Sequence, residues 1–284
     1  MKILITGGAG YIGSILVPTL LEQGHQVTVV DTFARGDTAL AMACPYDGFN
    51  PIRYDCRDER QLDDLVPQHD VLIPLAALVG APLCKEDPIA AQTTNQDAVI
   101  ALAKRASTSQ ILVYPTTNSG YGLGQGDTFC TEETPLNPIS LYGVTKMAAE
   151  NAVLDKQGIS FRLATEFGMA PRMRLDLLVN DFTWRAVTDR AVVIFEGHFK
   201  RNFIHVRDVV KGFMHGIENY ESMRSNAYNL GLSSANLSKL ELCAKIQEFV
   251  PSFTYLEALI GEDPDKRNYI VSNEKLEATG WSPD

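Results

Sequence analysis

The chain has 284 residues and a net charge of −10, and this acidic balance argues against nucleic acid as a partner, because a phosphate backbone requires a basic surface. Hydrophobic residues make up 45% of the chain, which is enough for a large core plus a smaller lobe and argues against disorder. Five cysteines without paired spacing, five histidines without ligand spacing and no run of about eighteen apolar residues lead us to expect reduced thiols, no metal, no membrane association and a cytoplasmic location.

The first element is an apolar strand at residues 2–6, which leads into a glycine-rich turn and a helix-forming segment. In a dinucleotide site each glycine has a separate role, since Gly7 makes the tight turn, Gly10 lets main-chain amides approach a pyrophosphate, and Gly13 lets the helix pack close to the strand. The phosphates then lie at a helix N-terminus, where unpaired N–H groups favour anions. The cofactor-binding residues expected in this turn are Gly7, Gly10, Tyr11, Ile12 and Gly13.

A second strand at residues 26–30 ends at Asp31. An acidic residue about twenty positions after the glycine turn takes the adenosine ribose hydroxyls in such sites, whereas the alternative is a solvated carboxylate at a strand end. A carboxylate there repels a 2′-phosphate. Arg35 lies past the turn and does not take the place of the Asp31 carboxylate. We therefore expect NAD rather than NADP.

Strand-like runs alternate with helical patterns, at residues 2–6, 26–30, 52–54, 70–75, 110–114 and 159–164. This alternation predicts an α/β fold with a Rossmann-type, doubly wound parallel sheet, whose ligand lies beyond the carboxyl ends of the strands. Residues that follow the third and fourth strands should then contact the cofactor, although close packing alone could explain the small ones. They are Asp55, Cys56, Leu75, Ala76 and Ala77.

The pattern becomes irregular after about residue 165. We expect a dinucleotide-binding domain over residues 1–165, which carries the catalytic groups, and mainly a smaller C-terminal substrate-binding lobe over residues 166–284. The boundary is expected to be interleaved.

Tyr142 and Lys146 are four residues apart, so on a helix both project from one face. A lysine cation and an oxidised nicotinamide would both stabilise the phenolate and lower the tyrosine pKa, which would make Tyr142 a base toward a sugar hydroxyl. By itself the pair also fits a solvated helix face. Here it follows a strand at 111–114 and a hydroxyl-rich segment, one of whose side chains could hold the reacting oxygen.

Four motifs occur in the order typical of one family: the glycine turn at 7–13, Asp31, the Tyr142/Lys146 pair and the segment 201–209. With these motifs the chain resembles the extended short-chain dehydrogenase/reductase superfamily, and within it the NAD-dependent nucleotide-sugar epimerases and dehydratases. The resemblance spans essentially the whole chain.

This resemblance implies roles for individual residues. Thr117 lies four residues before the Tyr121-Gly122 pair, where the family has its catalytic serine or threonine, and Tyr142 and Lys146 complete the triad. Tyr142 and Lys146 are also expected to bind the cofactor, Lys146 at the nicotinamide ribose. Asn95 matches a helix residue close to the cofactor, and His205 matches a structural histidine. Arg201 matches an arginine that grips the diphosphate, for which a bidentate guanidinium is well suited, with a surface ion pair as the alternative.

Two departures narrow the expected reaction. The family's 4,6-dehydratases carry Asp-Glu where this chain has Asn118-Ser119, and dehydration needs those carboxyl groups as acid and base, which argues against dehydratase activity. Many relatives also have asparagine in place of Thr165, where it contacts the sugar phosphate.

Residues 74–85 and 171–181 look most like a subgroup that oxidises a GDP-linked heptose at C4. In this reading Arg172 and Arg174 bind phosphates or base, with a structural role as the alternative. Cys84 is expected to be an inert buried thiol, with contact to the sugar as the alternative. The expected substrate-binding residues are Asn118, Ser119, Arg172, Arg174, Asn180 and Arg201.

Together these features predict an NAD-dependent oxidoreductase or epimerase that abstracts hydride at C4 of a nucleotide-diphosphate sugar and gives a 4-keto intermediate or product. The sequence leaves epimerisation and dehydrogenation open. A keto-sugar reductase is an alternative, and a 4,6-dehydratase or a non-catalytic NAD(H) redox sensor is less favoured. The resemblance also implies a homodimer through helices near 92–106 and 144–157.

Overall fold

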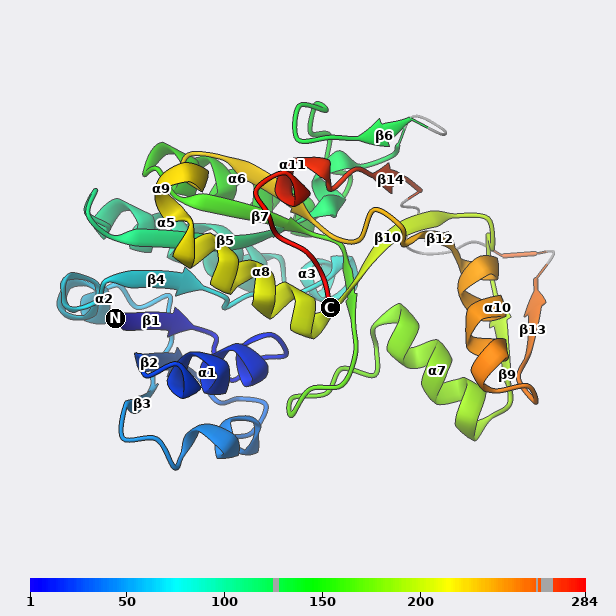
Figure 1. Cartoon of the computed structure of the whole chain (residues 1–284), viewed down its shortest axis with the longest axis horizontal. Helices are drawn as coiled ribbons and strands as arrows, with labels where there is room; N and C mark the ends of the chain where they lie inside the picture. Colours follow the sequence, from blue (N-terminus) through cyan, green and yellow to red (C-terminus); the bar gives the residue numbers. More distant parts are fainter. Residues whose placement is uncertain (125–127, 259, 262–267) are drawn as a thin grey trace.

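A sheet of seven parallel strands forms the centre of the computed structural model, which describes residues 1–124, 128–258, 260–261 and 268–284 (Figure 1). The strand order is β11-β7-β5-β4-β1-β2-β3, and every pairing is parallel. The strands are β1 (Lys2–Thr6), β2 (Gln26–Asp31), β3 (Phe49–Arg53), β4 (Val71–Pro74), β5 (Ile111–Thr117), β7 (Ile159–Leu163) and β11 (Ala227–Leu230). The strand order reverses between β1 and β4, so the Rossmann-type fold expected from the sequence is confirmed.

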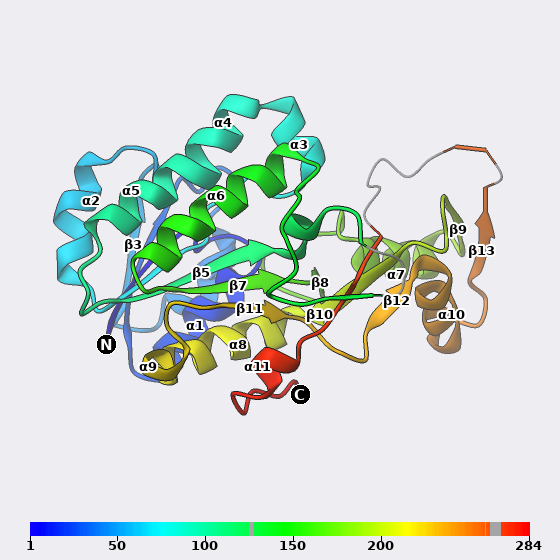
Figure 2. The same cartoon turned by 90° about the horizontal axis from the view of Figure 1, so that it is seen from above.

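Helices cover both faces of this sheet (Figure 2). One layer contains α2 (Arg60–Leu65), α3 (Ala81–Glu86), α4 (Pro88–Gln92), α5 (Ala98–Arg105) and α6 (Leu141–Asp155). The other contains α1 (Gly13–Glu22), α8 (Val206–Glu218), α9 (Tyr220–Met223) and α11 (Glu274–Glu277). Short helical turns are η1 (Thr38–Ala43), η2 (Val66–Gln68), η3 (Thr93–Asp97) and η4 (Asn118–Tyr121). None of the helices in the described ranges has the length and apolar character needed to cross a bilayer.

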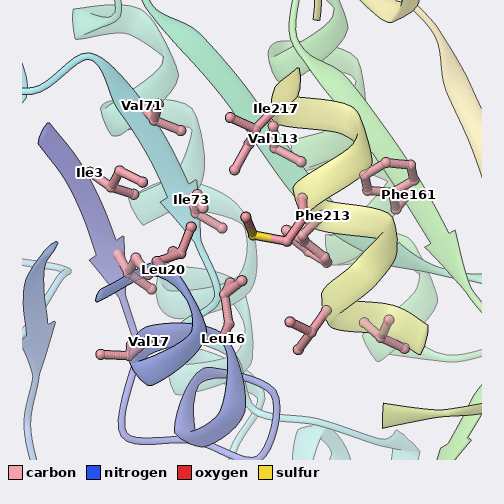
Figure 3. Packing of buried hydrophobic residues seen from close by; sticks show 14 of the residues in the cluster. Ile3, Leu16, Val17, Leu20, Val71, Ile73, Val113, Phe161, Phe213 and Ile217 are labelled. Atoms are coloured by element: carbon pink, nitrogen blue, oxygen red, sulfur yellow. The ribbon is translucent and has the colours of Figure 1, made fainter. Parts of the chain in front are cut away.

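The strands read as continuous apolar runs because both faces of the sheet are buried. Successive side chains point to opposite faces, so Ile3 and Ile5 pack in one core cluster while Leu4 packs in the other. Figure 3 shows Leu16 of α1 and Phe213 of α8 beside Ile73 of β4, at the centre of the first cluster. Burial of this many aliphatic and aromatic side chains holds the carboxyl ends of β1, β4 and β5 in fixed positions.

A second lobe lies beside the sheet and contains two small sheets (Figure 1). It is built from β8 (Thr165–Phe167), α7 (Leu178–Thr188), β9 (Ala191–Ile194), β10 (Lys200–His205), β12 (Asn236–Ser238), α10 (Lys239–Phe249) and β13 (Thr254–Glu257). Its core includes Phe182, Phe203, Leu242 and Phe253. A further pair of strands, β6 (Phe129–Cys130) and β14 (Ile270–Val271), forms a separate two-stranded sheet, in which β14 packs against β10.

Some elements differ from the sequence-based expectation. β3 begins at Phe49 rather than at residue 52, because Pro51 and exposed Asn50 are tolerated in a strand that pairs only with β2. β5 continues beyond residue 114 to Thr117, which makes Thr117 its last residue. β11 was not expected from the sequence at all, and with α8 it returns from the second half of the chain to the central sheet.

Candidate active site

The glycine turn meets the carboxyl end of β4 at the reversal of strand order. Gly7 has φ +74°, and a Cβ atom on it would lie 2.4 Å from the backbone nitrogen of Ala76. Only glycine fits there, so residues 7 and 76 are brought into contact although they are far apart in the sequence. In doubly wound sheets this reversal point is where ligands bind.

Two other glycines of the turn, Gly13 and Gly8, are required by close contacts with the turn itself and with β2. A Cβ on Gly13 would lie 2.2 Å from the carbonyl oxygen of Gly8, so Gly13 makes room for the turn itself rather than for the strand, which corrects our sequence interpretation. Gly8 is the residue that lies close to a strand, since its Cβ would lie 2.8 Å from Cγ1 of Val29 in β2. No role is expected for Gly8 from the sequence, although the Gly7-Gly8 pair is a local signal of a close backbone approach.

Asp31 connects the end of β2 to the same turn. Its carboxylate accepts hydrogen bonds from the backbone N–H of Ala9 (2.9 Å) and of Phe33 (2.8 Å). This carboxylate, beside a turn in which Gly7 and Gly13 admit no side chain, forms a cradle that fits a dinucleotide. Ile12 differs from the glycines, because its side chain packs against the hydrophobic core.

The residues after β3 and β4 border this cradle in different ways. Asp55 is partly exposed and forms an ion pair with Arg57 (2.5 Å), which lowers the pKa of its carboxyl group. Cys56 and Ala76 line one small pocket together with Thr6, and burial raises the pKa of the Cys56 thiol to about 12. Leu75 donates its backbone N–H to Thr6 (2.8 Å), and Ala77 follows it with a half-buried side chain.

Tyr142 and Lys146 lie one turn apart on α6, which begins at the Ser140 cap. Tyr142 is half-buried, whereas Lys146 is 3% exposed, with its Nζ 4.2 Å from the centre of the Tyr114 ring. Burial lowers the pKa of Lys146 to about 7, while nearby Glu166 and Glu150 act in the opposite direction. A lysine that titrates near neutral pH is typical of a functional position.

Thr117 lies at the carboxyl end of β5, and η4, which follows it, packs against α6. Its hydroxyl donates to Oγ of Ser119 (3.0 Å) and accepts from the backbone N–H of Ser119 (3.1 Å). Asn118 is 1% exposed, and neither polar atom of its amide has a hydrogen-bond partner in the described part of the chain.

Glu166 is a charged residue of this region that the sequence analysis did not single out. It lies on β8, is half-buried, and receives no hydrogen bond on its carboxylate from the described residues. Burial raises its pKa to about 7, against the opposing effects of Arg174 and Lys146. The only local signal in the sequence is a lone acid within the strand Thr165–Phe167, because the electrostatic effect of Glu166 on Lys146 depends on tertiary structure.

Asn180 joins three segments of the expected substrate side. Its Oδ1 accepts from the N–H of Gly168 (2.9 Å), and its Nδ2 donates to the carbonyl of Arg174 (2.9 Å) and to the hydroxyl of Tyr11 (3.4 Å). Tyr11 in turn donates to the carbonyl of Gly168 at 2.5 Å. The Asn180 amide thus links α7, the loop after β8 and the glycine turn.

The two arginines that precede α7 have partners of their own. Arg174 forms an ion pair with Asp176 (2.5 Å). Burial lowers the pKa of its guanidinium, but the negative charges of Asp176, Glu166 and Tyr142 together raise it above its ordinary value. Arg172 donates from its side chain to the carbonyl of Met173 (2.8 Å) and from its backbone N–H to Oγ of Ser14 (3.3 Å).

Arg201, on β10, is 5% exposed, so it is not a surface residue. Asn95 is fully buried and clasps the backbone of Leu78 after β4, accepting from its N–H (2.7 Å) and donating to its carbonyl (3.0 Å). Cys84 is also fully buried and donates to the same carbonyl (3.2 Å). His205 caps α8 and packs its ring against Phe167, which is a structural role.

Comparison with known proteins gives consistent matches over the whole chain. The UDP-glucose 4-epimerase of Corynebacterium glutamicum is 27% identical over 314 residues, which cover 100% of this chain and 91% of that protein. UDP-glucuronic acid decarboxylase 1 of Danio rerio is 28% identical over 302 residues, which cover 99% of this chain and 69% of the relative.

Solved structures confirm the fold. A UDP-glucuronic acid 4-epimerase from Bacillus cereus, solved with UDP-glucuronic acid and NAD, has a TM-score of 0.84 at 24% identity, with 100% of this chain and 94% of that chain covered. A dTDP-glucose 4,6-dehydratase from Streptomyces venezuelae, solved with NAD, has a TM-score of 0.85 at 21% identity, with 100% and 92% covered.

A family model described as the NAD dependent epimerase/dehydratase family matches residues 3–231. Because this match spans well over half of the 284 residues, the chain belongs to the NAD dependent epimerase/dehydratase family, which confirms the family and the cofactor expected from its motifs.

Proposed function

We propose that the protein oxidises a nucleotide-diphosphate sugar at C4, as a 4-epimerase or a 4-dehydrogenase. The observation that carries the proposal is the position of Tyr142 and Lys146 on α6, with Lys146 buried and titrating near neutral pH. The relatives support the substrate class, since the names of both the epimerase and the decarboxylase contain a UDP-sugar.

The cradle of Gly7, Gly10, Gly13 and Asp31 would hold NAD, with the main-chain amides of the turn on the pyrophosphate and the carboxylate on the adenosine ribose. When bound, NAD supplies the hydride acceptor for the sugar C4. Leu75, Ala76 and Ala77 border the same cradle at the end of β4, where Ala76 contacts Gly7.

The chain's own groups perform the proton transfer in this proposal. Thr117 orients the C4 hydroxyl, and Tyr142, as a phenolate, takes the hydroxyl proton. Lys146 keeps Tyr142 anionic, because a nearby cation favours the charged form of a phenol. The products of this half-reaction are a 4-keto sugar and a protonated Tyr142. Return of hydride to the other face of the sugar gives epimerisation, and release of the keto sugar gives dehydrogenation.

Arg201 would grip the diphosphate, because a buried guanidinium can bond phosphate oxygens in bidentate fashion. Arg172, Arg174 and Asn180 would complete the substrate side, and the subgroup resemblance of their segment supports a GDP-linked heptose as the sugar nucleotide. Dehydration is disfavoured, since Asn118 and Ser119 replace its acid and base.

Denaturation of the purified protein followed by mass spectrometry of the released nucleotide tests the cofactor, and we expect NAD. The protein is then screened with UDP-, GDP- and dTDP-sugars, GDP-heptose included, for absorbance of reduced cofactor and for 4-keto product. Tyr142→Phe serves as the blank. Response to none of these sugars would refute the proposal, and productive use of added NADH on a keto sugar alone would favour a reductase.

We further propose a homodimer through the outer faces of the helices near 92–106 and 144–157. Val144 on α6 is 47% exposed, as an interface residue of a free subunit would be. Light scattering should give twice the chain mass, and Val144→Glu should lower it to the monomer mass. A monomer in the unmodified protein would contradict the proposal.

A further inference from the structure

Tyr11 belongs to the cofactor turn, but its side chain reaches the second lobe. It is 6% exposed, and its hydroxyl donates to the carbonyl of Gly168 at 2.5 Å, across a sequence separation of 157 residues. The same hydroxyl accepts from Nδ2 of Asn180 (3.4 Å). Burial raises the pKa of the Tyr11 phenol to about 12, so the hydroxyl keeps its proton and remains a donor at neutral pH. Tyr11 therefore connects the turn to residues 168–174, the segment that follows β8.

Ser14, on α1, makes a second link between the same two parts of the molecule. Its Oγ donates to the carbonyl of Tyr11 (2.9 Å) and accepts from the backbone N–H of Arg172 (3.3 Å). Ser14 is 1% exposed, so these hydrogen bonds are shielded from water. The backbone of Arg172 is thus held by the helix that follows the glycine turn.

Hydrogen bonds, rather than hydrophobic packing, hold residues 168–174. Met169 is 80% exposed, and no residue of this segment belongs to a hydrophobic core cluster in the described part of the chain. At the far end of the segment, Nδ2 of Asn180 donates to the carbonyl of Arg174 (2.9 Å). Loss of the link to the cofactor turn should therefore loosen the two arginines that the segment contains.

The backbone of Tyr11 remains open for the dinucleotide. The N–H groups of Tyr11 and Ile12 have no acceptor among the residues that the structure describes, and they lie where the turn enters the N-terminus of α1. Unpaired N–H groups at such a position bond phosphate oxygens. A dinucleotide on this turn would thus order Tyr11 at its backbone, while the Tyr11 side chain contacts the second lobe.

We propose that Tyr11 is a positioning residue that couples the two ligands. NAD on the glycine turn fixes the Tyr11 hydroxyl on Gly168, and this bond holds residues 168–174 in place for the sugar nucleotide. The inference rests on the proposed function in assigning Arg172 and Arg174 to that nucleotide. The first ligand to bind orders the segment, so the second ligand binds without that entropic cost. Coupling between two sites is reciprocal, and each ligand therefore raises the affinity for the other by the same factor.

Hydrogen exchange with NAD alone tests the first half of the coupling. The full-length protein is freed of bound nucleotide with charcoal, and exchange is followed by mass spectrometry before and after NAD is added. The amides of Gly168 and Arg172 report on the segment, because they donate to Asn180 and Ser14. We expect NAD to slow their exchange by about 5-fold or more, the lower end of a typical coupling. Tyr11→Phe, which keeps the ring, should remove most of this protection.

Isothermal calorimetry with GDP, UDP and dTDP, without NAD and with saturating NAD, tests the second half. NAD should lower the Kd of the nucleotide that binds by about 5- to 150-fold, the usual range for coupled sites. This ratio should fall toward one in Tyr11→Phe and fall in part in Ser14→Ala. Tyr220→Phe is the matched control, because Tyr220 is 7% exposed and its hydroxyl also donates to a backbone carbonyl, that of Gln157 at 2.9 Å. Its ratio should equal that of the unmodified protein.

An unchanged ratio in Tyr11→Phe would overturn the proposal, and so would an equal loss in Tyr220→Phe, since any missing hydroxyl would then have the same effect. A ratio of one in the unmodified protein, with both ligands bound, would overturn the coupling and leave the proposed function standing. Protection by NAD without binding of any of the three nucleotides would overturn both. Coupling in a protein that oxidises no sugar nucleotide would support the role of Tyr11 and reject the proposed function.

Discussion

Two acidic residues near Lys146 differ in how the surrounding structure treats them. Glu150 is 1% exposed and satisfied by Thr116, Ser160 and Arg162, in a network that joins α6 to β5 and β7. Glu166 is half-buried, and the described residues give it no hydrogen bond. A fully hydrogen-bonded buried pair holds the sheet and helix together, whereas a half-buried carboxylate without hydrogen bonds can respond to protons and ligands.

The largest effect on turnover is expected at Tyr142, the proposed general base. Tyr142→Phe should lower turnover by about 10²- to 10⁴-fold, because a general base typically contributes that much. NAD binding should persist, since the cradle lies on other elements; isothermal calorimetry with NAD and a turnover assay measure the two. Tyr255→Phe, in the second lobe, is the matched control, and equal turnover in the Tyr142 variant and this control would remove the mechanism.

Arg162→Met tests the structural role of the Glu150 network. This change leaves the Glu150 carboxylate buried without its cation, so the free energy of unfolding should fall by about 3 to 5 kcal/mol. Urea denaturation measures the loss, and Arg207→Met on the exposed side of α8 should change little. A loss in Glu166→Gln as large as that in Arg162→Met would contradict the distinction between the two acids.

Lys146→Met tests whether the reactive region lowers stability. The pKa of Lys146 in the folded protein, about 7, lies below its ordinary 10.5, so between these values the unfolded chain binds a proton that the folded chain does not. The penalty that this group imposes on the free energy of unfolding is therefore absent above pH 10.5 and grows as the pH falls to 7. We expect Lys146→Met to raise the free energy of unfolding at pH 7 by about 1 kcal/mol or more, with the gain vanishing toward pH 11.

Denaturation curves across this pH range measure that gain. Lys245→Met, at an exposed position on α10, is the control and should show no such trend. A loss of stability at pH 7 in Lys146→Met would mean that the lysine is structural, and the contrast with Glu150 would no longer hold.

The smallest effect is expected at the N-terminus of α6, the helix that carries both Tyr142 and Lys146. Ser140 accepts from the N–H of Gly143 (3.2 Å), so Ser140→Ala should lower stability by about 1 kcal/mol and leave the pH profile of turnover unchanged. Thermal unfolding measures the first quantity. A shifted pH profile would show that the cap also affects the groups of α6 that titrate during turnover.

The parts of the site that sequence reasoning located are local in the chain. The glycine turn, Asp31 at the end of its strand and the spacing of Tyr142 from Lys146 each depend on residues close in sequence, so periodicity and motif spacing predict them. The parallel sheet followed from alternation of strands and helices for the same reason.

The rest depends on contacts that no local pattern contains. Glu166 lies on β8 and Lys146 lies on α6, which are separate elements of the chain. Asn180 joins segments from three regions of the chain. β3 includes Asn50 and Pro51, which are unfavourable in most strands, because a strand paired on one edge accepts them. β11 is too short, at four residues, to be recognised without its partner β7.

The late position of β11 in the sequence has a consequence for how the protein is made. The central sheet gains its last strand only when residues 227–230 have left the ribosome, after the strands β8 to β10 of the other lobe. Until then β7 has an unpaired edge, and Phe161 lacks the ring of Tyr228 that packs against it. The nascent chain therefore exposes aggregation-prone surface through much of its synthesis, and a fragment released early would be a natural client for chaperones.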